Sequence, residues 1–172
     1  MHNNKGLVRR LDELGRVVIP KEIRHSLKIE NGNMLEFFYS IQDGLVVKKF
    51  EPIREFAGFG AKLLYALRSY SENGFLLCDT EKVVAVQNLL KKDTIGKKLN
   101  PDLVEKLKLF HNSFDFEHPI ETQIKQNNKV FPVVVQGNVV GCVVVSSEKP
   151  QGSEVFASVS TIVQILVDYL SE

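Results

Sequence analysis

The run Asp12-Glu13-Leu14-Gly15-Arg16-Val17-Val18-Ile19-Pro20 constrains the fold of this chain more than any other segment. Asp and Gly favour a tight turn, and Gly tolerates a positive φ. The three β-branched residues that follow favour a strand. Pro20 cannot donate a hydrogen bond to a sheet, but it fits the first turn of a helix. The segment therefore predicts a turn, a short strand and a helix that begins at Lys21.

The first 50 residues are predicted to form four short strands and one helical turn. The expected strands are 6–11, 17–19, 34–39 and 45–47, and the expected helix is 21–27. Asp43-Gly44 between two apolar runs is typical of a hairpin turn. So short a segment buries little core, and a small sheet with exposed edges invites pairing with another chain. A second copy of the chain is the expected partner.

Positive charge is concentrated in the same region. Residues 1–50 carry nine Lys/Arg and six Asp/Glu, whereas the rest of the chain carries 13 Lys/Arg and 15 Asp/Glu. The net charge of the whole chain is only +1, but the N-terminal segment is basic. Clustered Lys and Arg are the electrostatic footprint of a phosphate-binding surface, because they displace condensed counterions. The alternative is an ordinary solvated surface on which Asp12, Glu13 and Glu22 pair with the arginines.

The segment from Lys5 to Phe50 resembles the DNA-binding hairpin of AbrB/SpoVT-type transition-state regulators of bacteria. The resemblance implies an all-β swapped-hairpin dimer unit over residues 1–51 that binds double-stranded DNA. The DNA-contacting side chains that it implies are Arg9, Arg10, Arg16, Arg24, Lys5, Lys21 and His25. Arg16 and Arg24 are expected to contribute most, and Asp12 and Glu13 to order the turn. His25 stands where the family frequently has an arginine, so that contact is expected to be weaker.

Beyond Pro52 the apolar spacing changes from that of strands to that of helices. Apolar residues alternate three and four apart from Ile53 to Tyr70, which predicts one continuous helix over 53–71. Two apolar stripes predict a second helix over 153–170. These stripes either cover the chain's own sheet or meet helices of a partner. A dimer through residues 1–50 is expected, and the two helices offer a further interface that would make a tetramer.

Between these helices the sequence predicts a sheet and one more helix. The expected strands are 74–79, 83–86, 120–124, 131–135 and 139–145, with a helix over 99–110. This element order resembles a GAF domain and implies an α+β GAF-like domain with flanking helices over residues 52–172. GAF domains typically hold a small molecule beside the sheet. The candidate ligand residues are Cys78, Phe110, Phe114, Phe116 and His118. Aromatic residues beside a sheet belong to the core more often than to a ligand site.

Other site classes find no support in the sequence. The four histidines, at positions 2, 25, 111 and 118, lack metal-ligand spacing and lie in no motif with Ser or Cys, so we expect no metal, no cofactor and no catalysis. Cys78 and Cys142 lie within apolar strands and are expected to be buried, reduced thiols. No run of 18 apolar residues and no leader sequence is evident, which favours a cytoplasmic, nucleoid-associated protein without a membrane segment.

The resemblance implies a transcription regulator of the sporulation or transition-state type, activating or repressing, whose C-terminal domain oligomerises and senses a small molecule. One alternative is an antitoxin-like module that binds a partner protein, because AbrB-like hairpins also occur in antitoxins. Antitoxin tails are typically short and often disordered, whereas residues 72–172 are apolar and periodic. Another alternative is a ligand-binding protein whose first half only holds two chains together.

Overall fold

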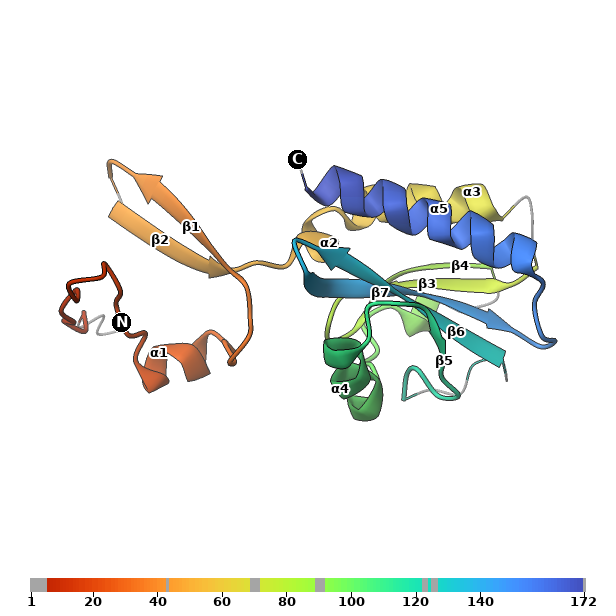
Figure 1. The fold of residues 1–172 in the computed structure, drawn as a ribbon, viewed down its shortest axis with the longest axis horizontal. Helices are drawn as coiled ribbons and strands as arrows, with labels where there is room; N and C mark the ends of the chain where they lie inside the picture. Colours follow the sequence, from red (N-terminus) through yellow and green to blue (C-terminus); the bar gives the residue numbers. More distant parts are fainter. Residues whose placement is uncertain are drawn as a thin grey trace. The chain divides into compact units, whose positions relative to one another are not determined.

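The computed structural model describes residues 6–42, 44–68, 72–88, 92–121, 124 and 127–171. The chain divides into two compact units, Met1–Phe50 and Glu51–Glu172. In Figure 1 the first unit is coloured red to orange, and the second runs from orange-yellow to blue.

The described part of the N-terminal unit contains one short helix and one hairpin. Helix α1 (Lys21–Ser26) starts directly after Pro20, as predicted. Strands β1 (Leu35–Ser40) and β2 (Gly44–Lys49) pair antiparallel, with Phe37 opposite Val47. Gly44 has a φ of 74°, which suits the predicted hairpin turn, although Asp43 lies outside the described residues.

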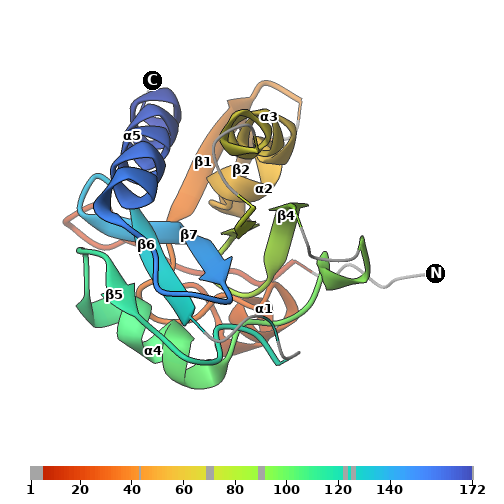
Figure 2. The same ribbon diagram turned by 90° about the vertical axis from the view of Figure 1, so that its right-hand side faces the viewer.

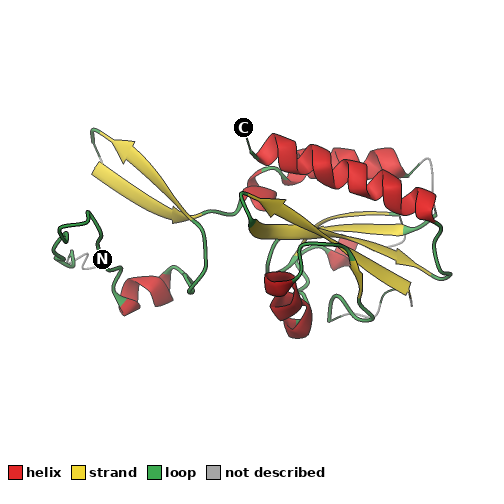
Figure 3. Cartoon of the chain, viewed as in Figure 1, coloured by secondary structure: helices red, strands yellow, loops and turns green. Residues whose placement is uncertain are grey.

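The strands predicted over 6–11 and 17–19 are not formed. Apart from a turn at residues 13–15, the segment 6–20 is irregular and is drawn as a loop in Figure 3. Val8 is 88 % exposed and Val18 is 75 % exposed. A β-branched segment becomes a strand only when a neighbouring strand takes its backbone hydrogen bonds. No such neighbour is present within the described part of a single chain, so propensity alone misled the prediction.

The C-terminal unit is built on a five-stranded antiparallel sheet with the order β4-β3-β7-β6-β5. Its strands are β3 (Gly74–Cys78), β4 (Val83–Gln87), β5 (Phe114–Asp115), β6 (Asn127–Val135) and β7 (Asn138–Ser147). The β6–β7 hairpin turns at Gln136 and Gly137, both with positive φ, between the strands predicted over 131–135 and 139–145.

Helices cover both faces of this sheet. In Figures 1 and 2, α3 (Ala57–Leu67) and α5 (Ser153–Leu170) lie on one side and α4 (Pro101–Leu109) lies on the other. The core on the α4 side includes Leu76, Leu103 and Val130, which are fully buried. Fully burying one such side chain stabilises the fold by about 1.5–3 kcal/mol. Short helices precede α3 and α4, namely α2 (Pro52–Glu55) and η1 (Lys92–Thr94).

Two predictions for this unit were wrong. The expected continuous helix 53–71 is divided at Phe56, whose φ of −102° and ψ of 21° leave the helical range; residues 69–71 lie outside the described part. Gly58, a poor helix former, follows the break. The strand expected over 120–124 is reduced to an isolated bridge between Leu99 and Ile120, with residues 122 and 123 not described. The place beside β6 is taken instead by β5.

Helix α5 is the one helix among the described residues that is long and apolar enough to cross a membrane. Its buried side chains include Val159, Ile162 and Leu166. They form the stripe that faces the sheet, and the Phe156 ring lies 5.9 Å from that of Phe131 in β6. A helix that covers the core of a folded unit has this same composition.

Candidate nucleic-acid interface and sensor cavity

The turn before α1 fixes the position of Arg16. The Asp12 carboxylate accepts hydrogen bonds from the backbone N–H groups of Leu14 (3.0 Å) and Arg16 (2.8 Å), and from Arg16 Nε (2.8 Å). Gly15, with a φ of 75°, closes the turn by donating its N–H to the Asp12 carbonyl. The Arg16 side chain nevertheless stays 72 % exposed. One edge of the guanidinium is therefore anchored, and the rest is presented to solvent.

These hydrogen bonds also keep Asp12 charged. The backbone N–H of Arg16, followed by its side chain, lowers the pKa of the Asp12 carboxyl below its ordinary value. An ionised carboxylate is the better acceptor for the guanidinium. The local sequence Asp-Glu-Leu-Gly-Arg thus produces a self-contained turn that holds one arginine outward.

Helix α1 carries a second group of cations. Arg24 Nη1 donates to Asn31 Oδ1 at 3.3 Å, and Arg24 Nε is buried without a hydrogen-bond partner. Lys21 and His25 are exposed. The loop after the helix is pinned by a hydrogen bond from the Ile29 N–H to the Arg24 carbonyl. Arg24 is thereby positioned by the segment that follows it.

The remaining predicted DNA-contacting residues lie near the start of the chain. Arg9 Nη1 donates to the Val8 carbonyl at 2.9 Å, and Arg9 and Arg10 are exposed. Lys5 lies outside the described residues. The five described cations and His25 therefore all belong to the segment 9–25. Their assignment as DNA contacts stays a prediction.

In the C-terminal unit, Cys78 belongs to the core. It is fully buried and lies opposite Cys142 across the β3–β7 pair. The hydrogen bond with Cys142, followed by burial, raises the pKa of the Cys78 thiol well above its ordinary value. Both cysteines are buried free thiols, as predicted. The thiol of Cys78 is thus neutral and enclosed.

The three predicted phenylalanines gather around one lysine. Lys106 Nζ lies 4.5 Å from the Phe114 ring centroid, 5.5 Å from that of Phe110 and 5.7 Å from that of Phe116. Such cation–π contacts tie α4 to β5 and to the residues that flank it. His118 is exposed on the loop that follows. This group lies on the α4 side of the sheet, where Phe114 and Phe116 pack against the buried core.

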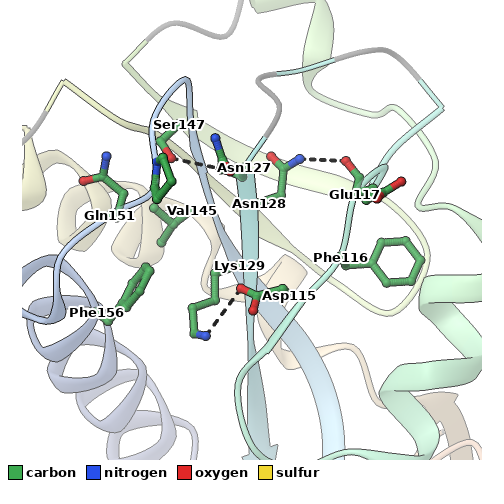
Figure 4. A pocket seen from close by; sticks show the side chains of 11 residues that line it. Asp115, Phe116, Glu117, Asn127, Asn128, Lys129, Val145, Ser147, Gln151 and Phe156 are labelled. Atoms are coloured by element: carbon green, nitrogen blue, oxygen red, sulfur yellow. Dashed lines mark hydrogen bonds and ion pairs between the residues drawn. The ribbon is translucent and has the colours of Figure 1, made fainter.

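A cavity of about 590 Å³ opens elsewhere, between β5, one end of the β6–β7 hairpin and the first turn of α5 (Figure 4). Lys129 Nζ lies 3.4 Å from Asp115 Oδ1 and 5.0 Å from the Phe156 ring centroid. Of the five predicted ligand residues, Phe116 alone lines this cavity. Its ring turns away from the polar groups in Figure 4.

Sequence reasoning missed the polar lining of this cavity. Asn127, Lys129 and Ser147 sit within β6 and β7, which otherwise read as apolar runs. The strands predicted over 131–135 and 139–145 ended before these residues, so the sequence pattern gave no signal for them. No group of three or more His, Cys, Asp or Glu side chains among the described residues is arranged to hold a metal ion.

Two family models match the chain. The model described as "Stage V sporulation protein T C-terminal, transcription factor" matches residues 55–170, and that described as "Antidote-toxin recognition MazE, bacterial antitoxin" matches residues 8–56. Stage V sporulation protein T of Bacillus subtilis is 34 % identical over 158 residues, which cover 87 % of this chain and 88 % of the relative. The transition state regulatory protein AbrB of the same organism is 45 % identical over 47 residues, 27 % of this chain and 48 % of its own.

Solved structures resemble the C-terminal unit. A type II free methionine-R-sulfoxide reductase from Thermoplasma acidophilum has a TM-score of 0.52 at 18 % identity, covering 69 % of this chain and 94 % of its own. The GAF domain of an Acinetobacter phosphoenolpyruvate-protein phosphotransferase has a TM-score of 0.52 at 13 % identity, covering 69 % and 90 %. At such identities these likenesses show the fold alone. They confirm the predicted α+β GAF-like fold.

Proposed function

This chain belongs to the stage V sporulation protein T family of transcription factors, and from that premise we propose that it binds double-stranded DNA through paired N-terminal units while its C-terminal unit oligomerises and receives a small-molecule signal. The N-terminal unit, of AbrB type, ends near residue 51, and the GAF-like domain follows it. We further propose that this regulator works on the nucleoid, in the cytoplasm, during sporulation or the transition state; the names of the relatives support the sporulation and transition-state part.

The observation that carries the DNA-binding proposal is the anchored, outward-facing Arg16. Its Nε is held by Asp12, while Arg9, Arg10 and Lys21 are exposed nearby in the sequence. An arginine held in this way loses less side-chain freedom when it binds a phosphate or a guanine edge. Two copies of the unit would double the number of such groups on one polyanion.

Exposed apolar side chains support the proposed assembly. In the N-terminal unit they include Leu7, Val8, Leu11, Leu14, Val17 and Val18. A partner chain that adds strands beside 6–11 and 17–19 would cover them, giving a swapped-hairpin dimer. On the C-terminal unit, Phe56 and Tyr169 are partly exposed and pack edge to face at 5.1 Å. Pairing of this second surface would give a tetramer, and the mass in solution would separate the two assemblies.

Replacing single arginines tests the DNA-binding proposal. Arg16→Ala and Arg24→Ala should each weaken binding about tenfold or more, since a good contact contributes roughly 1–3 kcal/mol. Arg68→Ala is the matched control, because Arg68 is an exposed arginine of the C-terminal unit that lies over Tyr65. Band shifts with operator-length duplexes, repeated over a salt series, give the affinities. Arg16 and Arg24 variants that bind like the control would reject the assignment.

An antitoxin-like role is the second candidate, because the matching model over residues 8–56 is named for antitoxins. It would require a partner protein held by the remainder of the chain. That remainder has its own packed sheet and matches a transcription-factor model over residues 55–170. A stoichiometric toxin recovered with the chain would favour the antitoxin role. The likeness to a reductase concerns the fold alone, and we propose no catalytic activity.

A further inference from the structure

We propose that the cavity between β5, the β6–β7 hairpin and the first turn of α5 binds a small zwitterion, with its carboxylate on Lys129 and its ammonium group on Asp115 and Glu117. This inference rests on the proposed sensing function and names both its site and its ligand class. Of the five ligand residues that the sequence suggested, the site includes Phe116 alone.

The cavity is on the α5 side of the sheet. Lys129 pairs in register with Val145, and Asn127 with Ser147, so these four side chains share one face. Phe156 of α5 completes the wall (Figure 4). On the α4 side, Leu76, Leu103 and Val130 are fully buried against one another. Room for a ligand therefore exists beside α5.

Two of the residues that line this open cavity are buried polar residues. Ser147 is 2 % exposed and shares the face of Lys129, whereas Asn128 is 5 % exposed and lies between Asn127 and Lys129 in β6, so its side chain turns to the other face. Ser147 Oγ donates to the Lys149 carbonyl at 2.7 Å. Asn128 Nδ2 donates to the Glu117 carbonyl at 2.7 Å. These bonds fix the segments on both sides of the opening, so the cavity walls are set before a ligand arrives.

The charges in the lining define the ligand class. Lys129 is the single cationic residue among the described lining residues, and Asp115 and Glu117 are the anionic ones. Asp115 is the register partner of Lys129, yet its side chain is 84 % exposed and the ion pair spans 3.4 Å. A ligand carboxylate can displace so loose a partner. The released carboxylate of Asp115, together with Glu117, then faces the ligand's ammonium group.

The apolar part of the ligand has a defined place. The Phe156 ring and Val145 form the apolar wall of the cavity beside Lys129. The Phe156 ring centroid lies 5.9 Å from that of Phe131. At the far end of α5, the Tyr169 ring lies 4.3 Å from Phe59 of α3. A ligand seated against the first turn of α5 therefore acts on a helix that also packs on α3.

Three compounds of matched shape test the proposal: L-phenylalanine, 3-phenylpropanoate, which lacks the amine, and 2-phenylethylamine, which lacks the carboxylate. The full-length protein is titrated and followed by NMR at Lys129, Ser147 and Phe156. L-Phenylalanine should shift these resonances at millimolar concentration, and each analogue should bind about tenfold more weakly. Lys129→Gln should weaken L-phenylalanine binding to a similar extent. Lys108→Gln should leave it unchanged, because Lys108 lies on α4 beside Glu105.

The proposal is overturned if L-phenylalanine leaves these resonances unmoved at about 10 mM, if 3-phenylpropanoate binds as well, or if Lys129→Gln binds as tightly as the natural chain. Asp115→Asn is the second variant should Lys129→Gln fail to fold, and it should discriminate less between L-phenylalanine and 3-phenylpropanoate. DNA binding by the same preparations is measured separately. Intact DNA binding without ligand binding removes this inference and leaves the DNA-binding proposal standing.

Discussion

The two units of this chain bury their apolar residues in opposite ways. In the C-terminal unit Leu64, Leu103 and Val130 have no exposed surface. In the described part of the N-terminal unit, Ile29 is the one large aliphatic side chain that is buried, and Val8 remains 88 % exposed. The comparison shows that one unit buries a core of its own, whereas the other leaves most of its large apolar side chains exposed, as the proposed pairing with a second chain requires.

Free energy explains why the two units differ. Burial contributes about 25 cal/mol per Å² of apolar surface, and ordering the backbone of each residue costs about 1–2 kcal/mol. The C-terminal unit offsets that cost with a sheet covered by helices on both faces. The N-terminal unit has one two-stranded hairpin and one short helix. A lone hairpin is marginal in water, so we expect the proposed association to supply the missing burial.

The largest difference that we expect between the two units is in how their secondary structure responds to dilution. A fragment of residues 1–50 should lose its secondary structure when diluted from about 100 μM to about 1 μM, because its folding is coupled to association. A fragment of residues 51–172 should keep its sheet over the same range. Circular dichroism at both concentrations measures this difference. A folded, monomeric 1–50 fragment at the lower concentration would abolish the comparison.

Truncating one leucine of the finished core should have the next largest effect. Leu64→Ala should lower the free energy of unfolding by about 2–5 kcal/mol, because Leu64 has no exposed surface on α3 and its removal leaves a cavity. Leu109→Ala is the control, since Leu109 is 78 % exposed, and it should change stability by no more than about 0.5 kcal/mol. Chemical denaturation of the 51–172 fragment gives both values. Equal effects would mean that the core is not packed as described.

Two glycines of α3 also test the packing of the C-terminal core, with a smaller expected change in stability. A Cβ at Gly60 would overlap the Leu77 side chain and approach Leu166, whereas a Cβ at Gly58 meets nothing within 4 Å. Gly60→Ala should therefore destabilise the unit by about 1–3 kcal/mol through overpacking. Gly58→Ala should stabilise it by up to about 1 kcal/mol, because alanine favours a helix. Opposite signs in thermal unfolding would verify that α3 lies close against β3 at Gly60, and equal signs would contradict it.

Local signals in the sequence were sufficient for much of the fold. Pro20 placed the start of α1, and two valine-rich runs over 131–135 and 139–145 placed the strands of the β6–β7 hairpin. These features depend on neighbours within a few residues. The strands expected at 6–11 and 17–19 depend on a ladder partner, and the sequence pattern does not say which chain provides it.

The two candidate sites differ in the same way: one is formed by neighbours in the sequence, and the other by residues that the fold brings together. Asp12 and Arg16 are four residues apart and meet in a turn that their own sequence dictates, so the sequence predicted that Asp12 orders the turn. Asp115 and Lys129 meet because β5 pairs with β6. Strand β5 was not predicted, so its charge pair and the cavity beside it could not be found from the sequence.

Removing the Asp12 carboxylate should have the smallest effect and tests whether the N-terminal unit orders its own arginine. Asp12→Ala should weaken DNA binding about threefold to tenfold, less than Arg16→Ala, because the cation remains but its Nε loses its anchor. The slope of log affinity against log salt should stay unchanged for Asp12→Ala and fall by about 1 for Arg16→Ala, where a phosphate contact is lost. Fluorescence anisotropy over a salt series measures both quantities.

The neighbouring acid Glu13 provides the control for the Asp12→Ala experiment, and the pKa of Asp12 sets the pH at which it is done. Glu13→Ala removes the same charge from the neighbouring residue without touching Arg16, so it isolates the electrostatic gain from deleting an acid. Because hydrogen bonds to Arg16 lower the pKa of Asp12, the anchor is fully present above the ordinary carboxyl value of 3.8 and is lost only as pH falls through the lowered pKa. The comparison at neutral pH therefore samples the intact turn. An Asp12→Ala protein that binds DNA as tightly as Glu13→Ala would mean that the partner chain or the DNA orders Arg16, and that even this turn is completed from outside the single chain.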